Sequence, residues 1–341
     1  MPSKTRKLKD FEAEFEATPA NLTANLEQKE EVEAEFEATP AILPSNMQSK
    51  KQKGDRYMEN TIIEALFATK AVRVAPEDQP FWYTSGKLGP FFINTHFLLE
   101  NEAAAGEVLK RIEKAIADSK LTAPEEIFDM MLAYYNKGGT FKMVSDKLAE
   151  AAKGLDFDYI SGGERRDYFF SMMPAYLLGK PHLTIYKDMT SVYSEAIDGP
   201  AVDSAEVDLK GKKALHIADL ITEASSYERA WIPVIRGLGS EITDTVAVVD
   251  RCQNGREVLK NLGVELHALT GIDKNLFDEA TSNGIINETQ KAMILHFLEN
   301  PSEYMTAFLK ANPDFIANEI AKGGKNKERA ELAIEKGYTN V

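Results

Sequence analysis

Candidate ligand-binding residues gather between Gly211 and Glu228, where the apolar run Ala214 to Ile217 is typical of a buried parallel strand. One acid, Asp219, follows the run, and amphipathic sequence from Tyr227 onward predicts a helix. The loop between them supplies the hydroxyl groups of Thr222, Ser225 and Ser226. Because N–H groups at a helix start can bind phosphate, the stretch predicts an anion site beside an acid for sugar hydroxyls or a cation. The alternative is a serine-rich turn that only caps the helix.

Basic residues follow other predicted strands. Arg165 and Arg166 lie in the glycine-containing loop from Ser161 to Asp167. Lys187 follows one predicted strand and Arg251 follows another. An acidic chain that binds phosphate needs local positive charge, so the two adjacent arginines are candidate phosphate ligands.

Strands and helices alternate in the part of the chain that positions these residues. Apolar runs predict five strands, at 157–160, 182–186, 214–217, 242–249 and 264–269. Helical patterns separate them at 168–178, from 227 onward and at 257–262. The alternation predicts an α/β fold with a doubly wound parallel sheet, in which ligands bind beyond the carboxyl ends of the strands. Residues 188–210 are expected to form a long irregular loop, of a kind that often serves as a lid.

An aromatic stretch from Phe81 to Asn94 is a second candidate site. Two strand-like aromatic runs flank a Ser-Gly-Lys-Leu-Gly-Pro turn at 85–90, which predicts a hairpin. The functional interpretation is an aromatic cover over a flat ligand, with Lys87 on an anionic group. The alternative is a hairpin whose aromatic side chains pack on the domain.

Composition divides the chain into three parts. Residues 1–55 contain Glu-Ala-Glu-Phe-Glu-Ala-Thr-Pro-Ala at 12–20 and again at 33–41. Their charge-rich sequence predicts a disordered or loosely helical tail, and the alternative is a partner-binding tail anchored by Phe15 and Phe36. Residues 56–270 are predicted to form the α/β domain. Residues 271–341 are predicted to form a helical C-terminal extension, with helices at 274–280, 287–299, 301–311, 313–322 and 327–336.

Charge and composition exclude several classes of protein. The 341 residues are 43% hydrophobic and 28% charged, which is typical of a globular protein, and the formal net charge of -14 argues against a nucleic-acid partner. The single cysteine, Cys252, excludes an internal disulfide and a cysteine-based zinc site. No apolar run approaches the ~18 residues of a membrane helix. The basic start continues into acidic sequence, so we expect no secretory signal, no membrane partner and a cytoplasmic protein.

In four motifs, covering about residues 57–270, the chain resembles the type I phosphoribosyltransferases, and among them the orotate-specific enzymes. The motifs occur in the family's order: the orotate-covering hairpin at 85–94, the pyrophosphate loop at 161–166, the phosphoribosyl pyrophosphate motif at 214–226, and an Asp-Arg-x-x-x-Gly segment at 250–255. The resemblance implies a doubly wound sheet with an aromatic hood. It also implies transfer of ribose 5-phosphate from phosphoribosyl pyrophosphate to orotate. The products are orotidine monophosphate and pyrophosphate, Mg²⁺ is carried in by the substrate instead of by protein ligands, and a homodimer is expected.

The resemblance also implies roles for individual residues. Arg251 would bind the orotate carboxylate, while Phe91 and Phe92 would lie against its ring and Lys87 beside it. Asp219 would hold the ribose hydroxyls. The 5′-phosphate would be bound by the three hydroxyl residues Thr222, Ser225 and Ser226. The pyrophosphate would face the three cations Arg165, Arg166 and Lys187.

The chain departs from the family pattern at three places. The family has two adjacent acids after the strand, whereas here Ala218 precedes Asp219. Glu223 and Ala224 stand within the phosphate loop. Between Asp188 and Leu209 there is no Lys, Arg or His, although the family's mobile loop carries a lysine. The departures predict an alternative function, a catalytically weakened or inactive nucleotide-sensing or regulatory protein, and leave a transferase for another base as a third.

Overall fold

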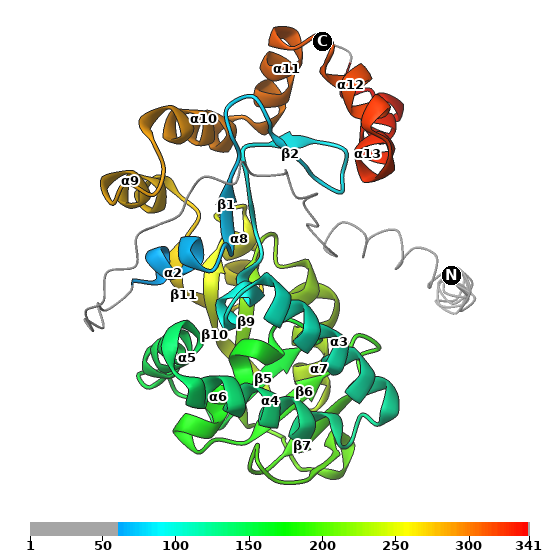
Figure 1. Ribbon diagram of the computed structural model, residues 1–341. Coiled ribbons are helices and arrows are strands. Elements are labelled where there is room, and N and C mark those ends of the chain that lie inside the picture. Colours follow the sequence, from blue (N-terminus) through cyan, green and yellow to red (C-terminus); the bar gives the residue numbers. More distant parts are fainter. Residues whose placement is uncertain (1–60, 340–341) are drawn as a thin grey trace, which may run out of the picture.

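A computed structural model of the protein describes residues 61–339, so the predicted tail at 1–55 lies outside the described residues. The largest sheet has seven strands in the order β11-β10-β9-β5-β6-β7-β8 (Figure 1). Its strands are β5 (Tyr159–Gly163), β6 (His182–Ile185), β7 (Ser191–Ser194), β8 (Ala201–Asp203), β9 (Lys213–Ile221), β10 (Glu241–Asp250) and β11 (Glu265–Gly271). All five predicted strands are present.

The five predicted strands pair in parallel. β9 is central, with β10 on one side and β5 on the other, and β11 and β6 follow outward. The α/β class with a doubly wound parallel sheet is therefore confirmed. β9 is longer than predicted and continues through Asp219 to Ile221, because its pairing with β10 extends to that point.

The predicted irregular loop at 188–210 is wrong over two short segments. β7 pairs antiparallel with β6, and β8 pairs antiparallel with β7. Thr184 thus pairs with Val192, and Tyr193 with Val202. Strands of four and three residues are too short to show a clear alternation of polar and apolar residues, so only the tertiary pairing reveals them.

Helices cover both faces of the sheet. β9 alternates between two hydrophobic clusters: Leu215 and Ile217 pack with helix α6 (Tyr168–Leu178). Ala214 and Ala218 pack with the helix after β9, which begins as η3 (Tyr227–Trp231) and continues as α7 (Ile232–Gly237). Chain order runs from β5 through α6 to β6 on one side, and from β9 through α7 to β10 on the other. The strand order therefore reverses between β5 and β9, and this reversal is where ligands bind in open α/β sheets.

Further helices enclose the face that α6 covers: α2 (Ile62–Ala68), the short helix η1 (Thr95–Leu99), α3 (Glu102–Asp118), α4 (Ala123–Lys137) and α5 (Gly139–Ala152). The helix α8 (Gly255–Asn261) lies on the other face. The first turn of α2 carries a capping box, in which the Thr61 side chain accepts from Glu64 N and the Glu64 side chain accepts from Thr61 N. This motif sets the start of the helix locally.

The predicted hairpin is shorter than expected. β2 (Phe81–Trp82) pairs antiparallel with β3 (Leu88–Gly89). The second aromatic run leaves the hairpin as β4 (Phe91–Ile93) and pairs with β1 (Val72–Val74). The four strands form two separate two-stranded sheets. The second run pairs elsewhere because Pro90 interrupts the strand after Gly89.

Five helices follow the sheet, as predicted: α9 (Lys274–Ser282), α10 (Glu288–Glu299), α11 (Pro301–Ala311), α12 (Phe315–Lys322) and α13 (Gly324–Glu335). Of these, α10 to α13 gather with the β2–β3 hairpin above the sheet, while α9 lies to the side, near α2 (Figure 1). Phe277 and Phe297 join the main core, and Met305 and Leu309 pack with Trp82 and Leu88 of the hairpin. The C-terminal helices are therefore not an appendage, since they share hydrophobic clusters with the rest of the fold.

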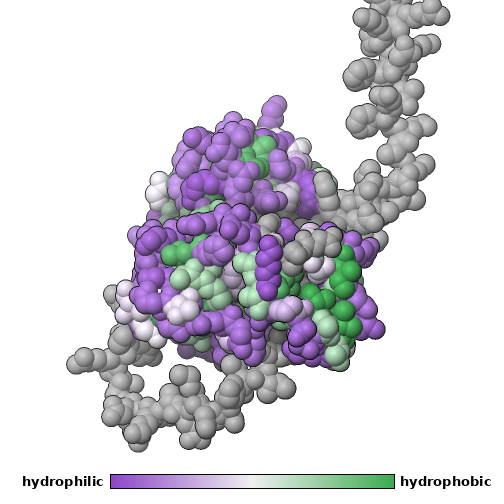
Figure 2. Space-filling model, turned by 90° about the horizontal axis from the view of Figure 1, so that it is seen from above, coloured by the Kyte–Doolittle hydropathy of each residue, from purple (hydrophilic) through white to green (hydrophobic). Residues whose placement is uncertain are grey.

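The face seen from above is mostly hydrophilic, with smaller hydrophobic areas (Figure 2). Among the helices of residues 61–339, none combines the length and the hydropathy needed to cross a bilayer.

Candidate active site at the switch point of the sheet

Three neighbouring strands end at one edge of the sheet. The order β10-β9-β5 brings together the segments that follow each strand. After β5 comes the loop with Arg165 and Arg166, after β9 comes the loop from Thr222 to Ser226, and after β10 comes Arg251. Residues from three predicted motifs, up to 86 positions apart in the chain, therefore share one edge.

Asp219 is the acid at this edge, and it is buried. The residue is only 8% exposed. Its Oδ2 accepts a hydrogen bond from Thr95 Oγ1 at 3.0 Å. Burial and the negative charge of Asp167 raise the pKa of Asp219 to about 7, against the opposing effects of Arg166 and Thr95. A carboxyl group with a pKa so far from its ordinary value is typical of functional sites.

Asp167 is a second acid at the switch point, and the sequence motifs assigned it no role. Its Oδ1 accepts from the backbone N of Asp219 at 3.0 Å, and its Oδ2 accepts from the backbone N of Gly163 at 3.2 Å. His216 Nε2 lies 3.3 Å from the same Oδ2, and His216 Nδ1 lies 2.9 Å from Ser161 Oγ. One tautomer satisfies both contacts, with the serine donating to Nδ1 and Nε2–H donating to the carboxylate. His216 is fully buried and links two strands.

The loop after β9 has the geometry of a tight turn into a helix. Ala224 adopts a left-handed φ of 57°, and its carbonyl accepts from the N–H groups of Tyr227 and Glu228. Gly255 N donates to Thr222 O at 3.0 Å. A Cβ on Gly255 would lie 2.6 Å from that oxygen, so only glycine allows α8 to approach the loop this closely. Ser225 and Ser226 are half-buried at the start of the helix.

The two arginines after β5 differ in their surroundings. Arg165 forms an ion pair with Glu113 on α3. Arg166 acts on Asp219, whose pKa its positive charge lowers. His96 is buried near both arginines: burial, then Arg166 and Arg165, hold the pKa of His96 well below its ordinary value. Among the described residues, His96 Nδ1 has no hydrogen-bond partner, and a buried orphan nitrogen is a feature that a ligand could satisfy.

Lys187 lies beside the arginine loop but points to solvent. Its backbone N donates to Glu164 Oε2 at 3.0 Å, which joins the turn after β6 to the loop after β5. The lysine is exposed, so its ammonium group is accessible at the rim of the edge.

Arg251 is buried after β10. Its backbone N donates to Ile221 O at 2.8 Å, so the residue lies directly beside the end of β9. Burial lowers the pKa of Arg251, while Tyr83 and Glu223 act in the opposite direction. Glu223, the unexpected acid of the phosphate loop, thus lies close enough to Arg251 to act on it electrostatically.

The predicted ring-binding residues Phe91 and Phe92 are buried in the hydrophobic core. Phe91 and Phe92 are each 2% exposed. The Phe91 ring contacts Phe277 at 5.4 Å, and the Phe92 ring contacts Phe81 at 4.9 Å between centroids. These residues form part of the core, so their predicted place against a bound ring is corrected to the packing alternative. Their aromatic sequence suits a core and a ligand cover equally well.

Lys87 contacts an aromatic ring of the C-terminal segment. Its ammonium nitrogen is 5.4 Å from the centroid of the Tyr338 ring, a contact between the hairpin turn and the end of the chain. This cation–π contact holds the Lys87 side chain against the Tyr338 ring.

Ala218 occupies the position of the missing acid and faces the opposite side of the sheet from Asp219. It is 2% exposed and packs in the cluster that contains Tyr227 and Trp231. The Trp231 ring fills the space beside Gly163, where a Cβ would lie 2.2 Å from the ring. The neighbourhood of Ala218 is therefore apolar.

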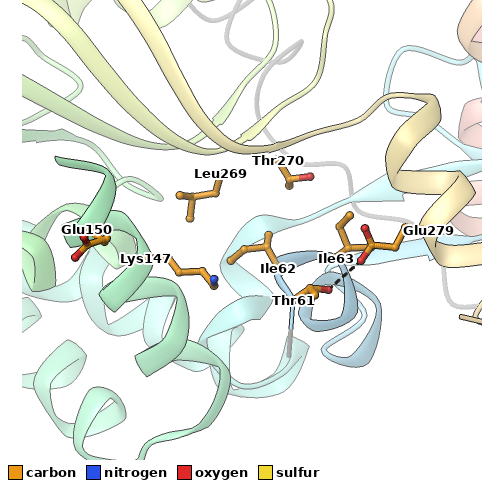
Figure 3. A pocket seen from close by; sticks show the side chains of 8 residues that line it. All are labelled: Thr61, Ile62, Ile63, Lys147, Glu150, Leu269, Thr270 and Glu279. Atoms are coloured by element: carbon orange, nitrogen blue, oxygen red, sulfur yellow. Dashed lines mark hydrogen bonds between the residues drawn. The ribbon is translucent and has the colours of Figure 1, made fainter. Parts of the chain in front are cut away.

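Two pockets are lined by other residues. One of about 360 Å³ lies between α2, α5, β11 and α9, lined among others by Ile62, Lys147 and Glu279 (Figure 3). Another of about 350 Å³ lies by Leu309 and Pro313. Within residues 61–339 there is no cluster of three or more His, Cys, Asp or Glu side chains suited to a metal ion.

Comparisons with known proteins point to one family of enzymes. No protein-family model matches the chain. The chain is 32% identical over 93 residues to an orotate phosphoribosyltransferase of Saccharolobus solfataricus, covering 27% of this chain and 47% of that protein. It is 30% identical over 129 residues to an adenine phosphoribosyltransferase of Butyrivibrio fibrisolvens, covering 35% of this chain and 71% of that protein. The match thus spans about half of the orotate relative and more than two thirds of the adenine relative.

Solved structures are similar at lower identity. A UMP synthase of Leishmania donovani aligns with a TM-score of 0.48 and 19% identity, over 70% of this chain and 41% of that chain. An orotate phosphoribosyltransferase of Francisella tularensis aligns with a TM-score of 0.46 and 14% identity, over 70% of this chain and 96% of that chain.

Proposed function

Since the chain belongs to the type I phosphoribosyltransferase family, we propose that it transfers the ribose 5-phosphate of phosphoribosyl pyrophosphate to orotate, giving orotidine monophosphate and pyrophosphate. The observation that carries the proposal is the meeting of three segments at the carboxyl edge of β5, β9 and β10. They supply an acid, a helix-start loop rich in hydroxyls, and arginines on both sides. Sugar phosphates need this combination of groups.

The phosphoribosyl part of the substrate is assigned to the segments after β9 and β5. Asp219 would accept hydrogen bonds from the ribose hydroxyls. The loop hydroxyls of Thr222, Ser225 and Ser226 would bind the 5′-phosphate. Arg166 lies close enough to lower the pKa of Asp219 and would face the pyrophosphate, with Arg165 and Lys187 at the rim. His96, with its unpartnered Nδ1, could donate to or accept from the same ligand.

The base is assigned to Arg251. An arginine binds a carboxylate with two parallel hydrogen bonds, which adenine cannot accept in the same way because it lacks that anionic group. The orotate relative supports this assignment. The adenine relatives support the coarser statement of a phosphoribosyltransferase.

Mg²⁺ would enter with the substrate. Magnesium is usually bound by one or two carboxylates together with substrate phosphates and water. Asp219 is one carboxylate at the edge, which fits a metal held mainly by pyrophosphate. When bound, the ion would neutralise charge on the leaving group.

The protein's own contribution to the reaction would be positioning and electrostatic stabilisation. The bond from the ribose carbon to pyrophosphate breaks as the bond to the base nitrogen forms, and the proton of that nitrogen passes to solvent or to the departing pyrophosphate. Negative charge therefore develops on the leaving pyrophosphate, where Arg165, Arg166 and Lys187 would stabilise it. Removing one such cation from a transferase site costs about 2–4 kcal/mol of transition-state stabilisation.

A second candidate function is nucleotide sensing without turnover. Ala218 replaces an acid and packs in an apolar cluster, and Glu223 adds negative charge to the phosphate loop. Both changes weaken substrate binding without removing the rest of the site.

The experiment that separates these functions is an assay of pyrophosphate release from phosphoribosyl pyrophosphate and Mg²⁺, with orotate and with adenine in parallel. Release that depends on orotate supports the proposal. Release that depends on adenine alone would show that the base is wrong. Binding of phosphoribosyl pyrophosphate by calorimetry without release with either base would favour sensing.

A further inference from the structure

Asp167 stands at a helix start but does not cap the helix. It is the N-cap residue of α6, and its side chain makes no capping hydrogen bond. N-cap aspartates are favoured because they normally accept from the first N–H groups of their helix. The Asp167 carboxylate turns instead toward the sheet, and the residue is 8% exposed.

The carboxylate bridges two strands at the point where they separate. The pairing of β5 with β9 ends at Ser161 and His216. Beyond that pair β5 continues beside β6 to Gly163, and β9 continues beside β10 past Asp219.

The Asp167 side chain lies where the next backbone hydrogen bonds between β5 and β9 would otherwise form. Its two oxygens accept from Asp219 N at 3.0 Å and from Gly163 N at 3.2 Å. Both N–H groups face the gap between the strands, and each would otherwise need another acceptor. The carboxylate therefore holds the two strand ends apart at a defined spacing.

The His216 side chain holds Asp167 in this position. Its Nε2 lies 3.3 Å from Asp167 Oδ2, and the ring stacks on Trp231 at 5.9 Å between centroids with 20° between planes. Ser161 Oγ lies 2.9 Å from the other ring nitrogen. The carboxylate thus has a fixed contact on each side, as expected of a group that sets geometry.

We propose that Asp167 is a positioning residue of the phosphoribosyl site, setting the separation and orientation of the main chain at Gly163 and Asp219 across the switch point. The inference rests on the proposed function, because Asp219 is assigned there to the ribose and the loop after Gly163 to the pyrophosphate. Asp167 touches neither ligand and acts through these two segments.

The Asp167 carboxylate also raises the pKa of Asp219, an effect that a carboxylate with a purely structural role would lack. The groups that act on or near Asp219 are Asp167 and Arg166 from the arginine loop, Thr95 from η1, Tyr227 from the following helix and His216 on the same strand. Asp167 is the negative one among them. Its removal should therefore let Asp219 ionise at lower pH.

The test compares Asp167→Asn with wild type on the full chain. Asparagine keeps the size of the side chain but replaces one acceptor oxygen with an amide donor that opposes a backbone N–H. We expect amide hydrogen exchange at Gly163 and Asp219 to become at least about tenfold faster, and the carboxyl titration of Asp219, followed by ¹³C NMR, to move down by about one pH unit. Affinity for phosphoribosyl pyrophosphate at pH 8 should fall about tenfold.

Two further variants separate charge from position. Asp167→Glu keeps the charge at the wrong length, so the Asp219 titration should stay near its wild-type midpoint while affinity for phosphoribosyl pyrophosphate falls. Asp146→Asn removes a half-buried carboxylate on α5 that pairs with Lys142, and should leave all three measurements unchanged.

The outcomes distinguish this inference from the proposed function. If wild type does not bind phosphoribosyl pyrophosphate, the proposed function fails, and exchange and titration still decide the role of Asp167. Unchanged exchange at Gly163 and Asp219 in both Asp167 variants would overturn the positioning role. Should Asp167→Asn fail to fold, Asp167→Glu supplies the exchange and affinity measurements.

Discussion

Trp82 Nε1 donates a hydrogen bond to Glu319 Oε2 at 2.8 Å, across 237 positions of the chain. Glu319 is only 3% exposed and also accepts from Asn326 Nδ2 at 2.6 Å. Arg329 Nη1 donates to the Trp82 carbonyl at 2.7 Å. The hairpin that follows β1 is therefore held by polar contacts from α12 and α13, in addition to apolar packing.

Loss of this contact should destabilise the protein. Glu319→Ala leaves the buried Trp82 N–H without its acceptor, and an unsatisfied buried donor costs about 1–3 kcal/mol. We expect a decrease of that size in the free energy of unfolding, measured by urea denaturation. Glu328→Ala, at an exposed position of α13, is the matched control and should change it by less than about 0.5 kcal/mol. Equal effects of the two substitutions would contradict a specific role for Glu319.

The raised pKa of Asp219 predicts a pH-dependent stability. The group titrates near 3.8 in the unfolded chain and near 7 in the folded one, so the native state binds the extra proton between these values. Stability therefore falls as pH rises from about 4 to about 7, and the cost is complete above pH 7. Asp219→Asn removes the cost while keeping an acceptor for Thr95.

We accordingly expect Asp219→Asn to be more stable than wild type at pH 8, by up to about 4 kcal/mol, and nearly equal to it at pH 4. Urea denaturation at the two pH values measures this difference. The same variant should bind phosphoribosyl pyrophosphate more weakly, by calorimetry with and without Mg²⁺, because the carboxylate assigned to the ribose is gone. A stability difference that does not change with pH would argue against the raised pKa.

The structure changes the expectation for Ala218. The family pattern alone predicts that Ala218→Asp would strengthen sugar binding by adding a second acid beside Asp219. Ala218 instead packs in an apolar cluster with Trp231, and a buried unpaired carboxylate is costly. We expect a loss of about 2–4 kcal/mol of stability and no gain in affinity for phosphoribosyl pyrophosphate. Ala218→Ser, with a smaller polar group, should lose less, and a tighter-binding, stable Ala218→Asp would show that the side chain reaches the sugar.

Arg251→Ala should abolish orotate binding and spare the binding of phosphoribosyl pyrophosphate. The reason is its position after β10, on the other side of β9 from the arginine loop. Calorimetry with each ligand separates the two effects, and Arg236→Ala on the exposed face of α7 is the control. Unchanged orotate affinity in Arg251→Ala would remove the orotate assignment while leaving the phosphoribosyl site in place.

Several secondary-structure elements could be predicted from the sequence because their signals are local. The apolar runs of β5, β9 and β10 and the helical patterns after Gly271 each depend on residues within a few positions of one another. The order of these elements was enough to predict a parallel sheet and the edge at which Asp219, Arg166 and Arg251 meet.

Contacts between groups far apart in the sequence could not be predicted and follow from the tertiary fold. Asp219 bonds to Thr95, which lies 124 positions away in the sequence. Asp167 turns from its helix to the gap between β5 and β9. That gap opens because β5 continues beside β6 while β9 continues beside β10. The same aromatic run that could cover a ligand is buried against α9 and α10, since helices far along the chain supply its neighbours. Hydrophobic periodicity predicts which side chains are buried, but the residues that contact each buried side chain follow from the packing of the whole chain.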